Sequence, residues 1–134
     1  VFNGKEEEVG EALLSKTKNL QLPHLIIDLS KGLSEEDLQE IFVSFLDALN
    51  LITFFTANEN EARSWFVKKD TPAPQAASVV HTDFEEKFIK AEVINWEKLN
   101  EAGSWQQAKQ KGLLRLEGKE YLVQEGDIVL IKHG

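Results

Sequence analysis

The chain is organised around the residues TPAPQAASVVHTDF, which run from Thr71 to Phe84. The two prolines exclude a helix ahead of Pro74, because a residue that precedes proline avoids the helical region. Pro74 itself suits the first turn of a helix, where its missing N–H costs nothing. Small side chains follow it, so we predict a short helix from Gln75 to His81 that lies close on a sheet. Polar groups at 81–83 bond their own backbone and end this helix.

Strands are predicted on both sides of the helix. Residues 51–56 and 62–67 predict a pair of strands joined by a turn at 58–60, and residues 88–94 predict a further strand. In that strand Ile89 is expected to share a face with Ala91 and Val93. The remaining residues predict a helical turn at 96–101, a capped helix through 108–111, a hairpin from 113–116 and 121–123, and a strand at 128–131. This mixture predicts a small α+β domain.

The first fifty residues follow a different pattern, strand–helix–strand–helix. Residues 1–3 predict the end of a strand, 6–17 a helix and 24–29 a buried strand. Ser34 caps a second helix, whose apolar residues recur at helical spacing from Leu38 to Leu49. This is half of an α/β layer, which does not bury both faces of a two-stranded sheet unaided. The change of pattern places a domain boundary near Asn50.

Composition excludes several classes of protein. The 134 residues are 42% hydrophobic and 28% charged, which is typical of a globular chain. No run is long enough to cross a bilayer, and the absence of cysteine excludes disulfides and thiolate metal sites. The three histidines are far apart, and the acidic runs at 6–8 and 35–37 suit helix N-termini. We expect no metal site, no membrane partner and a cytoplasmic location.

The charge is distributed unevenly along the chain. Its net value of −8 argues against generic electrostatic binding of nucleic acid, and no DNA partner is expected. Residues 1–50 carry 4 basic and 10 acidic side chains, net −6, whereas residues 51–134 carry 11 and 13, net −2. A local basic surface is therefore expected only in the second part.

Long, ordered runs of the second part resemble the C-terminal TGS domain of the YchF/Obg-like ATPases. The match extends from about Leu51 to the end, and it rests on the runs 55–57, 61–65, 73–77, 81–85, 88–93 and 120–128. The resemblance implies a ubiquitin-like β-grasp fold for residues 51–134. It also implies that residues 1–50 are a partial α/β segment from the end of a P-loop nucleotide-binding domain.

The same resemblance implies part of a nucleotide site in the first fifty residues. The family's base-recognition motif, Asn-x-x-Glu at a strand end, matches Asn3 and Glu6, and Ser30 resembles a serine of a later loop near the base. ATP or GTP with magnesium is implied for the full-length parent. The chain has no P-loop to cradle phosphates, so we expect no catalytic residues, no cofactor and no hydrolysis by this chain alone.

Three functions are weighed for the chain. The first is a regulatory module that contacts RNA or the ribosome, the second a ubiquitin-like module that binds a protein partner, and the third a piece of an ATPase or GTPase. His81 is expected either to cap its helix by bonding backbone carbonyls or to serve recognition. The three tryptophans either stack on bases or belong to the core. The recognition residues expected for RNA or a partner are Arg63, Lys68, Lys69, His81, Lys87 and Lys90.

Overall fold

A computed structural model describes residues 1–5, 9–21, 23–57 and 61–134. The chain forms two compact units, residues 1–50 (unit 1) and residues 51–134 (unit 2). Glu6 and the turn predicted at 58–60 lie outside the described residues. None of the described helices is long and apolar enough to cross a membrane.

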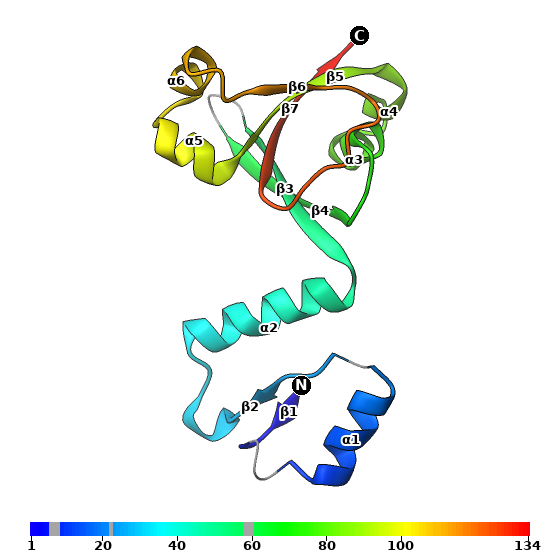
Figure 1. Cartoon of the computed structure of the whole chain (residues 1–134), viewed down its shortest axis with the longest axis vertical. Coiled ribbons are helices and arrows are strands. Elements are labelled where there is room, and N and C mark those ends of the chain that lie inside the picture. Colours follow the sequence, from blue (N-terminus) through cyan, green and yellow to red (C-terminus); the bar gives the residue numbers. More distant parts are fainter. Residues whose placement is uncertain (6–8, 22, 58–60) are drawn as a thin grey trace. The chain divides into compact units, whose positions relative to one another are not determined.

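Unit 1 contains a two-stranded parallel sheet and two α-helices (Figure 1). Strand β1 (Phe2–Asn3) pairs with β2 (Ile26–Ile27), so the strand predicted at 24–29 is shorter than expected. The remaining elements are α1 (Glu11–Asn19), the 3-10 turn η1 (Leu29–Lys31) and α2 (Glu35–Ala48). Helix α1 starts later than predicted because Gly10 occupies its N-cap.

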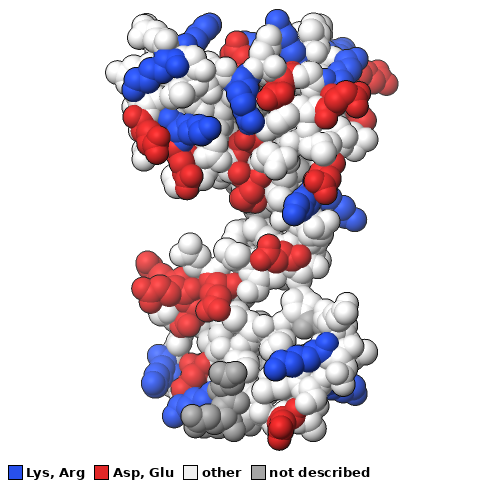
Figure 2. Space-filling view, viewed as in Figure 1, with Lys and Arg blue, Asp and Glu red and all other residues white. Residues whose placement is uncertain are grey.

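Helix α2 begins at a capping box, as its sequence predicted. The Ser34 hydroxyl accepts from the Asp37 N–H at 3.1 Å, and Asp37 Oδ2 accepts from the Ser34 N–H at 2.9 Å. Acidic side chains gather over this first turn, where the positive end of the helix dipole stabilises them (Figure 2). The apolar stripe of α2 is not a core face within unit 1, because none of the residues 35–48 is buried.

Unit 2 is a mixed α+β layer built on a five-stranded sheet (Figure 1). The strand order is β4-β3-β7-β5-β6, with β3 parallel to β7 and the other pairs antiparallel. The strands are β3 (Leu51–Ala57), β4 (Ala62–Lys68), β5 (Phe88–Asn95), β6 (Arg115–Glu117) and β7 (Asp127–His133). The helices are α3 (Ala73–Val80), α4 (Phe84–Lys87), α5 (Trp96–Ala102) and α6 (Trp105–Gln110).

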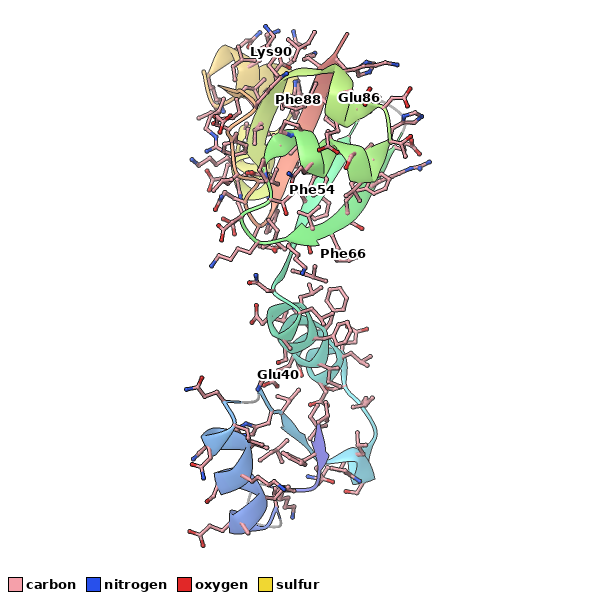
Figure 3. The ribbon with its side chains drawn as sticks, turned by 90° about the vertical axis from the view of Figure 1, so that its right-hand side faces the viewer. Glu40, Phe54, Phe66, Glu86, Phe88 and Lys90 are labelled. Atoms are coloured by element: carbon pink, nitrogen blue, oxygen red, sulfur yellow. The ribbon has the colours of Figure 1, made fainter. Side chains whose placement is uncertain are left out.

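Each face of the sheet is covered by its own pair of helices. Figure 1 shows α3 and α4 on one side of the sheet and α5 and α6 on the other. Phe54 and Phe88, both buried, belong to the core beneath α3 together with Val93 (Figure 3). Alternate residues of the same strands, such as Ile94 and Ile128, pack against α5 and α6. The period-2 alternation of the strands thus produces two separate cores.

Helix α3 begins at Ala73, one residue ahead of the start predicted from Pro74. Two further sequence predictions in unit 2 are wrong. A β-bulge shifts the β5–β7 register between Phe88 and Lys90, so Ile89 does not share the buried face of Ala91 and is 56% exposed. Residues 121–123 do not form a hairpin with 113–116, because β6 pairs with β5 instead. The segment is held at the start of α3, where the Ala73 N–H donates to the Tyr121 carbonyl at 2.7 Å.

Candidate functional site

A cleft of about 250 Å³ opens on the α3 face of the sheet in unit 2. Its floor comes from alternate residues of three adjacent strands, including Thr56 of β3, Trp65 of β4 and Ile131 of β7. Val80, at the end of α3, and Phe84, at the start of α4, form one wall. The cleft therefore lies where α3 stops covering the sheet.

The Phe84 ring on this wall contacts the rings of two histidines. The His81 and Phe84 ring centroids are 5.2 Å apart, and those of Phe84 and His133 are 4.4 Å apart with an interplanar angle of 22°. The chain end is held beside α4 because the Gly134 N–H donates to the Lys87 carbonyl at 3.0 Å. His133 lines the cleft and is exposed to solvent.

The opposite side of the cleft is formed by β4. The Trp65 indole Nε1 donates to the Thr56 hydroxyl at 2.9 Å, which fixes the ring across the β3–β4 pair. At the rim, the Arg63 guanidinium forms an ion pair with Glu61 at 3.1 Å, with both side chains more than half exposed. Exposed ion pairs contribute little to stability, so this rim is polar without being rigid.

The six residues predicted to bind RNA or a partner do not form one patch. Lys68 ends β4 and Lys69 follows it, so Lys68 lies roughly 17 Å from Arg63 at about 3.3 Å per residue. Lys90 precedes the buried Ala91 and projects from the face opposite α3, beside Lys132 on β7. Lys87 forms an ion pair with Asp83 at 3.1 Å. Only Arg63 and His81 border the cleft region, the latter through Phe84.

His81 occupies the C-cap of α3, but not in the way that the sequence predicted for a capping residue. Its Nδ1 accepts a hydrogen bond from the Asp83 N–H at 3.3 Å instead of bonding backbone carbonyls. The hydrogen bond and charge of Lys87 lower the pKa of Asp83. This local geometry turns the chain sharply into α4 and places Phe84 against both histidines.

The ends of β1 and β2 bring together two of the three predicted base-binding residues. Asn3 ends β1, and its Oδ1 accepts from the Leu29 N–H at 3.0 Å at the start of η1, which contains Ser30. Asp28 accepts from both the N–H and the hydroxyl of Ser30, and these hydrogen bonds lower the pKa of Asp28. The carboxyl ends of parallel strands are the usual edge for a nucleotide. Glu6 lies outside the described residues.

The described residues contain no group of three or more side chains suited to hold a metal ion. Of the three tryptophans, Trp65 lines the cleft, Trp105 packs against the α5–α6 core and Trp96 is 49% exposed. Sequence reasoning missed His133 and Phe84 as cleft residues. No spacing rule links them, because their contact joins α4 to a strand more than forty residues later.

Comparison with known proteins places unit 2 in a family. A family model described as YchF-GTPase_C, "Protein of unknown function (DUF933)", matches residues 51–134. The chain belongs to the YchF-GTPase C-terminal family. This agrees with the resemblance carried by the runs between 55 and 128, and the family match begins at the first residue of unit 2.

Relatives of this YchF family are similar over most of the chain. It is 40% identical over 124 residues to "Ribosome-binding ATPase YchF" of Bacillus subtilis, covering 92% of this chain and 32% of that protein. It is 42% identical over 104 residues to "Obg-like ATPase 1" of Homo sapiens, covering 78% of this chain and 26% of that protein. The solved structure of the Schizosaccharomyces pombe YchF GTPase matches with a TM-score of 0.68 and 35% identity, covering 96% of this chain and 30% of that one. The chain thus spans about a third or less of the length of these relatives.

Proposed function

We propose that this chain is a non-catalytic binding module of a YchF-type ATP- or GTP-binding protein, and that unit 2 contacts the ribosome. The observation that carries the proposal is the 40% identity to a ribosome-binding ATPase over 92% of the chain. Unit 2 also holds 11 of the 15 cations. Figure 2 shows these cations interspersed with acidic side chains on the face in view. Attraction to phosphate would therefore come from individual cations and not from one large basic surface.

We propose a β-grasp fold of the TGS type for unit 2. Two features support it. The first strand of the unit, β3, lies parallel to its last strand, β7, in the middle of the sheet. Helix α3 follows the β3–β4 pair and packs across the sheet over Phe54 and Val93. Such a fold presents loops and helix ends as contact surfaces, where binding residues are commonly found.

Cosedimentation with purified ribosomes over a series of salt concentrations tests the ribosome contact. We expect binding that weakens steeply as salt rises, because contacts to RNA phosphates release counterions. A shallow salt dependence would favour the second function, a ubiquitin-like module that binds a protein. Absence of cosedimentation at low salt would reject the ribosome as the partner.

A second function, part of a base-recognition site, is favoured by the strand ends of unit 1. The hydrogen bond from Leu29 to Asn3 Oδ1 leaves the Asn3 amide NH₂ as a donor beside Ser30, which is the chemistry that a base edge requires. ATP or GTP with magnesium would be bound by the longer parent, where a P-loop supplies the phosphate contacts. In this chain Asn3 and Ser30 would orient the base only.

A further inference from the structure

The cleft in unit 2 has the size of a single ring system. Its volume of about 250 Å³ falls below the roughly 300–1,000 Å³ of sites that enclose drug-sized ligands. Aliphatic and aromatic side chains line most of it, among them Val80, Ile131 and Trp65. A flat, mainly apolar group with one polar edge therefore fits this space.

Two rings on this side of the cleft form a stacking platform. His133 is stacked on Phe84 at a centroid separation of 4.4 Å and an interplanar angle of 22°, and His81 contacts Phe84 in a tilted arrangement at 5.2 Å. His133 lines the cleft and is exposed, so a further ring placed against it in the cleft would extend the stack. Unpaired nucleic-acid bases stack on aromatic rings in this way regardless of sequence, because every base has a π-face.

The rim supplies the charge that such a ligand requires. Arg63 forms an exposed ion pair with Glu61, a contact of little net stability. Arginine binds phosphate with paired N–H groups, so the guanidinium is suited to exchange this carboxylate for a phosphate. The Trp65 N–H already bonds Thr56, which leaves the indole ring to serve as apolar surface.

We propose that this cleft receives one unpaired RNA base, stacked on His133, with a neighbouring phosphate on Arg63. This inference rests on the proposed ribosome contact and names its chemistry. An apolar protein side chain also fits the apolar floor. It would not use the ring stack and the arginine together, and for this reason the RNA base is favoured.

The test uses the full 134-residue chain with Trp96→Phe and Trp105→Phe, so that Trp65 is the only tryptophan. Single-stranded hexauridylate and hexaadenylate are titrated while Trp65 fluorescence is recorded, and a 12-base-pair RNA duplex serves as the comparison. We expect quenching by both single strands at concentrations where the duplex gives none. Unpaired bases are available for stacking, whereas those of the duplex are not.

Variants at the platform and the rim give the sharper result. His133→Ala should weaken single-strand binding about 5- to 150-fold, the range for losing one base–aromatic stack, and His133→Phe should restore it. Arg63→Gln should make the slope of log binding constant against log salt concentration shallower by about 0.7, the value for one phosphate of a single strand. Lys119→Gln removes the same charge from an exposed turn outside the cleft and should leave the fluorescence change intact.

Ribosome cosedimentation of the same variants separates this inference from the proposed function. If the parent chain binds ribosomes and His133→Ala binds equally well, the base site is wrong and the ribosome contact stands. Quenching of Trp65 by single strands without any ribosome binding would support the base site and show that the ribosome does not supply the RNA that binds there.

Discussion

The Tyr121 hydroxyl donates a 2.5 Å hydrogen bond to Oδ2 of Asp127, a carboxylate that is 1% exposed. The same oxygen accepts from the Gln124 N–H at 2.9 Å, and Arg115 lies 3.4 Å from Oδ1. Arg115 also donates to the Tyr121 hydroxyl at 2.8 Å. This network joins the start of β7 to the segment 121–123, which is held at the start of α3, and it explains how an acid is tolerated inside unit 2.

Removing the carboxylate from this network should destabilise unit 2. Asp127→Ala leaves the Gln124 N–H and the Tyr121 hydroxyl without their acceptor, and we expect a loss of about 2–4 kcal/mol in the free energy of unfolding. Urea denaturation followed by tryptophan fluorescence measures it. Glu120→Ala, an exposed acid on the same segment, is the control and should change stability by less than about 0.5 kcal/mol. Equal effects of the two variants would show that the network is not structural.

The stability of unit 2 should fall between about pH 10 and pH 12. Burial, with the Asp127 hydrogen bond as a second cause, raises the pKa of Tyr121 from 10.0 to about 12. The folded state therefore keeps the tyrosine proton while the unfolded state loses it, so this stabilisation is complete below pH 10 and is lost as pH rises through 12.

The Tyr121 contribution is measured as the difference between the parent and Tyr121→Phe, because lysines titrate in the same range. Tyr121 is half-buried, so we expect the difference in unfolding free energy to shrink by on the order of 1 kcal/mol from pH 9 to pH 12. A difference that stays constant over this range would contradict the raised pKa.

Gly126 should not tolerate a side chain. Its φ is +78°, and an added Cβ would approach Trp96 Cδ1 to 2.7 Å and Asn95 Nδ2 to 3.2 Å. Gly126→Ala should cost about 1–3 kcal/mol from backbone strain and displacement of Trp96, measured by urea denaturation. Gly118→Ala is the matched control, since nothing lies within 4 Å of its added Cβ. Comparable stabilities for the two alanine variants would rule out a steric requirement at Gly126.

The sequence predicted the elements of unit 2 better than their pairing. The β3–β4 pair, α3 and β7 follow from local alternation and from the turn chemistry of the prolines. The bulge at Ile89 and the route of residues 121–123 did not follow, because both depend on long-range contacts with β7 and with α3. Alternation alone therefore assigned Ile89 to the wrong face.

The candidate site was only partly predictable for the same reason. Arg63 and His81 stood out as a cation and a histidine near the proline-rich stretch. His133 is some fifty residues from His81 in sequence, and only the docking of β7 beside α4 brings the two into one stack through Phe84. The lysines at 68, 69, 87 and 90 lie on strands or loops around the predicted helix, but strand geometry separates them.

The two units should differ in their ability to fold alone. Residues 51–134 contain two cores on the faces of one sheet and should give a well-dispersed amide NMR spectrum when expressed separately. Residues 1–50 should give a collapsed spectrum, because among their described residues only Thr17 and Ile27 are buried. A collapsed spectrum for residues 51–134 would contradict the independence of unit 2.

The chain by itself should bind nucleotide weakly and should not hydrolyse it. Asn3 and Ser30 would contact a base but not the phosphates, so we expect affinities weaker than micromolar for ATP and GTP by isothermal titration. Any changes in amide NMR chemical shift at high nucleotide concentration should be confined to residues 2–3 and 28–31. These changes should be lost in Asn3→Ala. Micromolar affinity would show that the site is more complete than these residues make it.

Hydrogen–deuterium exchange of the full chain, with and without purified ribosomes, tests the central claim most directly. Contact through unit 2 predicts that the ribosome slows exchange within residues 51–134. The slowing should be strongest beside the cleft, at the start of β4, at the end of β7 and in the turn between α3 and α4. Residues 1–50 should exchange at the same rate in both samples. Slowed exchange confined to residues 1–50, or no change anywhere in a chain that cosediments, would contradict a ribosome contact through unit 2.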